Sequence, residues 1–267
     1  MSTRTYTFST AQPLTLRVSN PAGEVEIIAT ETAQTSVEVI PRHSSGQASA
    51  ERTRVELSGD GTRLDVEAPE HRFTSGGRLR MSIRLPAGSS VDVSTASADV
   101  ICRGSLAGLE VRTASGDVDA DHVNGDVAIS SASGDVALGT VTGSVECKTA
   151  SGDVRAVGVE GGCRANSASG DVNIGSCGGD VFVRTASGDV QVRRAERGRV
   201  DITTMSGDVK VGVRRGTVVW IDASTMSGRT RSDLQSQDAP EDGEVLSISV
   251  RTMSGDITLS PATVVTV

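Results

Sequence analysis

The pentapeptide Ala114-Ser115-Gly116-Asp117-Val118 decides the fold, because the chain repeats it at a constant spacing. The same five residues recur at intervals of 18, beginning at Ala132, Ala150, Ala168 and Ala186. A related copy precedes them in the same register, at Ala96 to Val100. Three looser copies follow, and in these a methionine replaces the alanine: Met205, Met226 and Met253. A fixed period of this length is typical of a solenoid, in which each repeat stacks on its neighbour.

A weaker glycine motif lies about half a period after most copies, as in Gly125-Asp126-Val127 and Gly179-Asp180-Val181. After each turn, apolar and polar residues alternate, as in Val172-Asn173-Ile174. Alternation with period two indicates a half-buried strand, and no segment has a helical period. One unit of 18 residues therefore contains two turns and two short strands.

These patterns predict an all-β fold, a right-handed parallel β-solenoid with coils of about 18 residues over 95–267. Residues 1–94 are β-rich but less regular, and we expect either wider coils or a capping sandwich. Within them, 55–57 and 64–66 flank a tight turn and predict a hairpin. A polar loop is expected near 232–243, and the apolar segment 263–267 is either a last rung or an exposed edge.

The interior is expected to be narrow and aliphatic, because aromatic residues make up 2% of the chain. The change from alanine to methionine in the last copies suggests a wider interior near Trp220. The four cysteines, Cys102, Cys147, Cys163 and Cys177, stand where sister repeats carry Val, Ile, Leu or Ala. They are interpreted as small buried hydrophobic residues rather than disulfides or metal ligands.

The Gly-Asp pairs form the most regular candidate site, a structural turn ladder with one member per coil. Glycine is favoured at a positive φ or where a corner has no room for Cβ, and aspartate can cap nearby backbone N–H groups. A calcium ion between stacked carboxylates is the alternative, but the motif differs from that of calcium-binding β-rolls. The ladder comprises Gly116, Asp117, Gly134, Asp135, Gly152, Asp153, Gly170, Asp171, Gly188, Asp189, Gly207 and Asp208.

A second column consists of hydroxyl residues that precede the turns. Strand alternation places these side chains on the inner face, which favours a hydroxyl ladder inside the corner over an ice-binding surface. The column comprises Thr95, Thr113, Ser131, Thr149, Ser167, Thr185 and Thr204.

The net charge of −8 argues against nucleic acid or an anionic membrane as the default partner. Residues 96–183 carry 12 acidic and 5 basic side chains, which is −7 of that charge. A basic cluster follows, which is either a solvated face, a docking patch for an acidic partner or a contact between copies. Its candidate residues are Arg184, Arg193, Arg194, Arg197, Arg199, Arg214 and Arg215.

No catalytic, cofactor or metal site is predicted. His43, His71 and His122 are scattered without a nucleophile beside them, and the regular coils lack the long loops that build a cleft. The start of the chain, Met1 to Ser19, has no continuous apolar run, and no membrane-spanning segment is visible. Cytoplasmic residence is therefore the expected location.

The repeats, together with Leu85-Pro86-Ala87-Gly88 and Asn20-Pro21-Ala22-Gly23, resemble the bacterial β-strand-repeat family known as putative adhesins, or the toastrack domain. This resemblance implies a β-solenoid-like fold, and related domains are associated with envelope-stress signalling. We expect a non-catalytic module, an intracellular scaffold that binds an unidentified protein without inserting into membranes. The alternatives are an exported adhesin or ligand-binding protein, and a polymer that self-associates through terminal strands.

Overall fold

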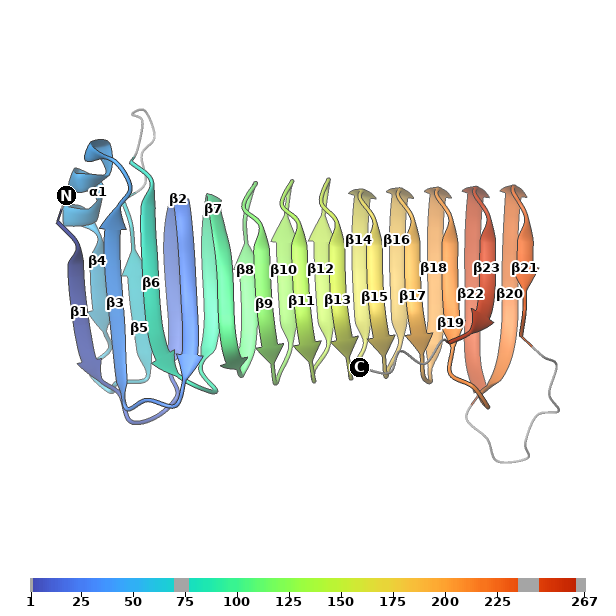
Figure 1. The fold of residues 1–267 in the computed structure, drawn as a ribbon, viewed down its shortest axis with the longest axis horizontal. Helices are drawn as coiled ribbons and strands as arrows, with labels where there is room; N and C mark the ends of the chain where they lie inside the picture. The colour runs from blue at the N-terminus through green and yellow to red at the C-terminus, as the bar shows by residue number, and fades with distance from the viewer. Residues whose placement is uncertain (1, 70–76, 235–244, 263–267) are drawn as a thin grey trace. The chain divides into compact units, whose positions relative to one another are not determined.

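A computed structural model describes residues 2–69, 77–234 and 245–262. The chain divides into two compact units, residues 1–135 and 136–267. Both consist almost entirely of β-strands (Figure 1), so the predicted all-β solenoid is confirmed. The expected boundary between residues 94 and 95 lies inside a continuous strand, β7 (Ser90–Leu106).

The N-terminal unit contains ten strands and two short helices, one of them a 3-10 helix, among its described residues. The elements are β1 (Arg4–Ser9), β2 (Thr15–Thr30), β3 (Gln34–Pro41), η1 (Ser44–Gly46), α1 (Gln47–Arg52), β4 (Arg54–Leu57), β5 (Arg63–Glu67), β6 (Leu79–Pro86), β7, β8 (Gly108–Arg112), β9 (Val118–Val123) and β10 (Val127–Ser131).

The coils of this unit do not stack in chain order. Strand β2 pairs in parallel with β7 on one side, and with β5 and then β6 on the other. The coil made by β2 therefore lies between two coils that follow it in the sequence. Antiparallel strands extend this end: β3 pairs with β6, and β1 pairs with β3. The region thus combines wide parallel coils with an antiparallel cap. The predicted hairpin is confirmed, with Val55 opposite Val66 in β4 and β5.

The C-terminal unit has the regular two-strand coil that the repeat predicts. Its strands are β11 (Val136–Val141), β12 (Val145–Thr149), β13 (Val154–Val159), β14 (Cys163–Ser169), β15 (Val172–Cys177), β16 (Val181–Ser187), β17 (Val190–Ala195), β18 (Arg199–Ser206), β19 (Val209–Val213), β20 (Val218–Ser227), β21 (Thr230–Ser232), β22 (Val245–Ser254) and β23 (Ile257–Pro261).

Two parallel ladders run through this unit. Equivalent residues pair at the 18-residue interval, so that Val154 lies opposite Val136 and Val172. The order changes at the end: β22 pairs with both β18 and β20, while β23 pairs with both β19 and β21. The coil of β22 and β23 is thus inserted between two coils that precede it in the sequence (Figure 1).

The core is aliphatic, as expected, and its fully buried members are valine, isoleucine, leucine, alanine and cysteine with one methionine, Met81. The prediction of a wider interior filled by larger residues is wrong. Met205, Met226 and Met253 are 57%, 82% and 51% exposed, and Trp220 is 58% exposed. Alternation explains this result: Thr204 faces inward, so Met205 beside it faces outward.

Two expected features fall largely outside the described residues. They are the polar loop, of which 235–243 is not described, and the terminal segment 263–267.

Candidate functional site

The Ser-Gly-Asp motif forms the corner between one strand of a coil and the next, for example between β16 and β17. Gly188 has a φ of 135°, and a Cβ built on it would lie 2.2 Å from the carbonyl oxygen of Gly170 in the adjacent coil. Gly134 is not in the positive-φ region, yet its Cβ would lie 2.0 Å from the carbonyl oxygen of Gly116. Close approach between coils is therefore the requirement that both glycines share.

The aspartates of this corner connect neighbouring coils through the backbone. In the C-terminal unit the N–H of Asp189 donates to Oδ1 of Asp171 over 2.8 Å, and Asp208 donates to Asp189 over the same distance. In the N-terminal unit Asp135 N–H donates to Asp117 Oδ1 over 2.9 Å. Each carboxylate thus satisfies the corner amide of an adjacent coil. The described residues hold no group of three or more His, Cys, Asp or Glu side chains able to bind a metal ion.

The hydroxyl column lies behind this corner, and its predicted inward orientation is confirmed. Thr149, Thr185 and Thr204 are at most 8% exposed. The hydroxyl of Thr185 donates to the carbonyl of Ser187 over 3.0 Å, and Thr204 donates to Ser206 over 3.1 Å. These bonds stabilise the turn from the inside.

The opposite corner of the coil joins the end of one odd-numbered strand to the start of the next even-numbered strand. Two backbone hydrogen bonds keep neighbouring coils aligned at the start of this corner. The N–H of Glu196 donates to the carbonyl of Cys177, and the N–H of Arg214 donates to the carbonyl of Ala195, over 3.1 Å in each case. The residues beyond differ from coil to coil: 178–180 is Gly-Gly-Asp, 196–198 is Glu-Arg-Gly, and 214–217 is Arg-Arg-Gly-Thr. This corner therefore tolerates variation that the Ser-Gly-Asp corner does not.

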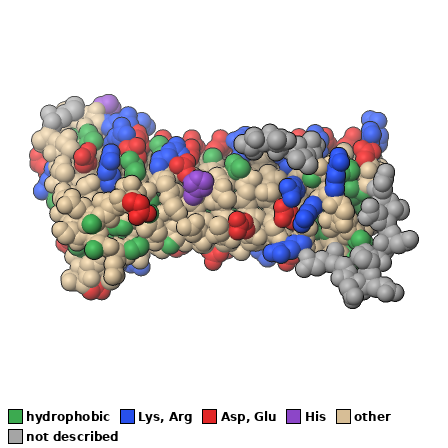
Figure 2. Space-filling view, turned by 60° about the horizontal axis from the view of Figure 1, so that its bottom comes forward, with side chains coloured by type: hydrophobic (Ala, Val, Ile, Leu, Met, Phe, Trp, Pro, Cys, Tyr) green, Lys and Arg blue, Asp and Glu red, His purple; other side chains and the backbone are tan. Residues whose placement is uncertain are grey.

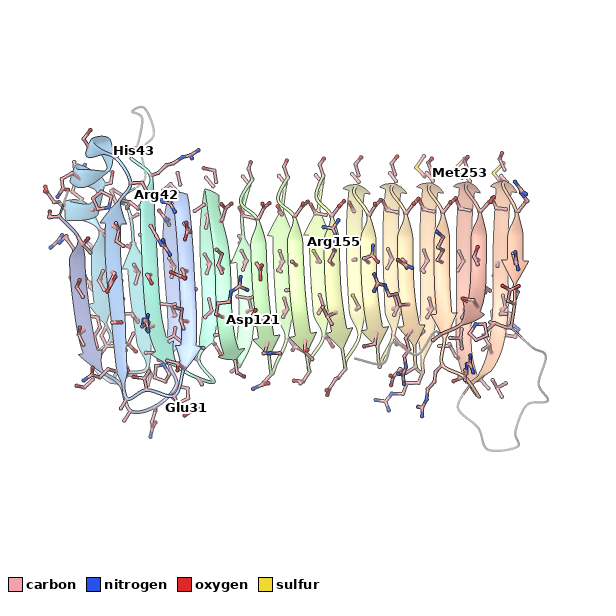
Figure 3. All side chains as sticks on the ribbon, viewed as in Figure 1. Glu31, Arg42, His43, Asp121, Arg155 and Met253 are labelled. Carbon is pink, nitrogen blue, oxygen red and sulfur yellow. The ribbon has the colours of Figure 1, made fainter. Side chains whose placement is uncertain are left out.

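Five of the predicted docking residues lie at this opposite corner of two adjacent coils. We call them the basic corner: Arg193 and Arg194 at the end of β17, Arg197 in the turn that follows, and Arg214 and Arg215 in the turn after β19. All five are exposed. Figure 2 shows several Lys and Arg side chains close together at its right, and Figure 3 shows side chains extending from this edge of the ribbon.

Two of the five side chains have partners among the residues that the structure describes. Arg194 pairs with Glu196 at 3.2 Å, and Arg197 Nε donates to the carbonyl of Gly178 over 2.8 Å. Arg193, Arg214 and Arg215 form no ion pair with any described residue.

The other two predicted docking residues are placed differently. Arg199 begins β18, beside the basic corner, and pairs with Asp201 at 2.7 Å. Arg184 lies in the middle of β16, away from the corner, so it does not join the cluster.

A cavity of about 700 Å³ lies beside the basic corner in the C-terminal unit. Its lining includes Arg214, Arg215, Val219, Ile221 and Leu234. The described residues of the lining contain one carboxylate, Asp233, which pairs with Arg231 at 3.0 Å, and no histidine. Among the described lining residues, no acid and base converge on this space.

The four cysteines are free and buried, as the repeat comparison predicts. Burial raises the pKa of the Cys102 and Cys147 thiols to about 12 and also raises that of Cys163 and Cys177. A reactive cysteine needs a lowered pKa and access to solvent. These thiols therefore act as core residues.

This geometry defines a β-solenoid repeat protein built from stacked coils of short parallel strands. The chain belongs to the Toastrack DUF4097 family, whose model matches residues 14–260. The resemblance inferred from the repeats is thus confirmed. No curated protein matches the sequence.

Solved structures with a similar fold include a putative adhesin from Bacteroides fragilis, with 12% identity, a TM-score of 0.52 and 97% coverage of each chain. Another is a putative lipid binding protein from Parabacteroides distasonis, with 16% identity, a TM-score of 0.49 and 96% coverage of each chain. At 12% identity the likeness to the Bacteroides fragilis structure concerns the fold alone. Among the described residues no helix is long and apolar enough to cross a membrane.

Proposed function

We propose that this chain is a non-catalytic, adhesin-type module that binds an acidic macromolecular partner, in the first instance a protein, through its basic corner. One observation carries the proposal: Arg193, Arg214 and Arg215 lie on adjacent coils, are exposed, and form no ion pair with a described residue. Guanidinium groups without a carboxylate partner suit carboxylates, sulfates and phosphates, which accept their parallel N–H donors.

The surroundings of the basic corner support a binding role. Trp220 in β20 is 58% exposed and aligns with Ser247 of β22, which in turn aligns with Arg199 of β18. Tryptophan and arginine are the residue types that contribute most to binding at protein interfaces. An exposed tryptophan two coils from a cluster of arginines is consistent with an interaction surface.

The test is binding of the full chain to immobilised poly-L-glutamate, measured between low and high salt. We expect binding that weakens steeply as salt is raised. It should be lost when Arg193, Arg214 and Arg215 are all replaced by serine. A matched control replaces Arg63, Arg112 and Arg155, which are also exposed but lie within ion pairs on strands. If the two variants bind poly-L-glutamate equally well, or if the wild-type chain does not bind it, the proposal is overturned.

The compartment determines which partner the module meets. We propose cytoplasmic residence, with a scaffold role that extends to envelope-stress signalling, and the exported adhesin is the competing form. Fractionation of the native cells separates the two. Recovery at the cell exterior would exclude the scaffold, whereas recovery in the cytosol would exclude the adhesin.

A second candidate function is self-assembly, which one feature favours. Among the described residues β20 pairs with β22 alone, and its inward-facing Ile221 is 38% exposed, whereas Ile248 at the same position in β22 is fully buried. An unpaired apolar strand edge is a site where another chain can add. Replacement of Ile221 by lysine should abolish any filaments seen by electron microscopy. Filaments that persist in this variant would exclude this edge.

A further inference from the structure

Three methionines meet at one position of three adjacent coils, and we call them the methionine strip. Each stands between a threonine and a serine, and these flanking residues pair in register. Thr252 lies opposite both Thr204 and Thr225, and Ser254 lies opposite both Ser206 and Ser227. The inserted coil therefore places Met253 between Met205 and Met226. Figure 3 shows sulfur atoms along this edge of the ribbon, where Met253 is labelled.

Packing does not explain these side chains. They are 57%, 51% and 82% exposed in the order Met205, Met253, Met226. Six other copies of the corner have alanine at this position. Three exposed methionines in a row, each with a flexible thioether, form an unusual surface, because methionine normally fills gaps in cores.

The spacing suits joint coordination of one ion. Parallel strands lie about 4.8 Å apart, so adjacent methionines start from positions separated by that distance. A metal–sulfur bond of about 2.3 Å allows two sulfurs on one ion to lie up to about twice that distance apart. Each side chain has three rotatable bonds and can orient its sulfur without moving the backbone.

The donor type selects the ion. A thioether is soft and uncharged, which favours Cu(I) and other soft monovalent cations over calcium, magnesium or manganese. Two of the three coils carry a carboxylate at the same corner, because Asp208 and Asp256 follow Met205 and Met253 by three residues. The third coil has Arg229 at the corresponding place. A cation is therefore favoured between Met205 and Met253.

We propose that the methionine strip binds one soft monovalent cation, Cu(I) or Ag(I), through the sulfurs of Met205 and Met253, with Met226 as an additional ligand. This site is separate from the basic corner and does not depend on the function proposed above. No redox step is involved, because the ion binds and leaves as the monovalent cation.

The experiment uses the full chain with ¹³C-labelled methionine methyl groups and Ag(I), which needs no reductant. The methyl signals of Met205 and Met253 should shift in parallel as one equivalent is added. The signal of Met81, which is fully buried, should not move and serves as the internal reference. Zinc and calcium should leave all these signals unchanged.

Leucine variants separate coordination from mere exposure, because leucine keeps an apolar side chain but offers no donor. The triple variant M205L/M226L/M253L should bind one ion fewer than the wild-type chain. M253L should weaken binding at least tenfold, and M226L should weaken it less. The four cysteines are present in every variant, so silver bound by thiols is the same in all of them. Equal silver uptake by wild type and triple variant, or shifts of Met81 instead, would overturn the proposal.

Discussion

The two corners of each coil differ in which residues they require. At the Ser-Gly-Asp corner, the glycine approaches the carbonyl of the adjacent coil and the aspartate caps its amide, so most coils carry the same residues. Ala98 replaces the glycine in the first copy, and Arg229 replaces the aspartate in the copy that begins at Met226. At the opposite corner, backbone alignment ends near residues 196 and 214, and the turns beyond differ in length and charge. One corner therefore sets the period of the stack, while the other is free to carry binding residues.

This difference makes glycine substitution at the first corner the strongest perturbation. Gly188→Ala places a Cβ 2.2 Å from the Gly170 carbonyl oxygen, at a φ of 135° that alanine rarely adopts. We expect a loss of about 3 to 5 kcal/mol in the free energy of unfolding, measured by urea denaturation. Gly59→Ala is the control, because nothing lies within 4 Å of its Cβ. Similar losses for the two variants would remove close approach as the cause.

Much of this contrast can be predicted from the sequence. Identical spacing of Ala114, Ala132 and Ala150 identifies the period, and alternation places Val172 and Ile174 inside and Thr185 beside the corner. The same alternation, applied to Met205, would have placed it outside. The size of the methionine side chain suggests a filler of the interior, but its place in the strand, next to the inward-facing Thr204, decides that it faces outward.

Other features of the fold cannot be predicted from any local pattern in the sequence. The motif intervals lengthen at this end, to 21 residues from Met205 to Met226 and 27 from Met226 to Met253, but longer intervals do not reveal that β22 lies between β18 and β20 in the stack. The separation of Arg184 from the basic corner likewise depends on its place in the coil rather than on its distance in sequence from Arg193. Such arrangements follow from pairing between coils, which the residues of a single coil do not specify.

We expect the buried thiols of the core to make the free energy of unfolding fall at high pH. Burial raises the pKa of Cys102 and Cys147 to about 12, so the folded state keeps both thiols protonated. Their contribution to stability is complete below the unfolded thiol pKa of about 8.5 and falls as pH rises towards 12. At pH 10 we expect a loss of about 1 to 2 kcal/mol per thiol.

Urea midpoints at pH 7.5 and pH 10 measure this loss, and the double variant C102A/C147A is the comparison. Its midpoint should change less over the same range. Equal pH dependence of the two proteins would show that these thiols are not responsible.

The aspartate at the first corner should matter less than the glycine. Asp171→Ala removes the acceptor of the Asp189 N–H, now 2.8 Å from Oδ1, and should cost about 1 kcal/mol. Asp171→Asn keeps an acceptor oxygen and removes a like charge from the ladder, so its stability should lie within about 0.5 kcal/mol of the wild type. Glu160→Ala, an exposed carboxylate outside the ladder, is the control. If Asp171→Asn lost as much stability as Asp171→Ala, the effect would come from the charge of Asp171 and not from its acceptor oxygen.

The smallest effect on stability is expected at the basic corner, where the effect on binding is largest. Arg214 and Arg215 contact no described carboxylate, so their joint replacement by serine should change the free energy of unfolding by less than about 0.5 kcal/mol. Arg103 is the counterpart with a structural role, because it bridges Asp119 at 2.6 Å and Asp121 at 2.8 Å. Arg103→Ser should cost up to about 1 kcal/mol and leave binding to poly-L-glutamate intact. If the serine variant of Arg214 and Arg215 were destabilised, this corner would also hold the coils together. The Ser-Gly-Asp corner and the basic corner would then not divide stability and binding between them.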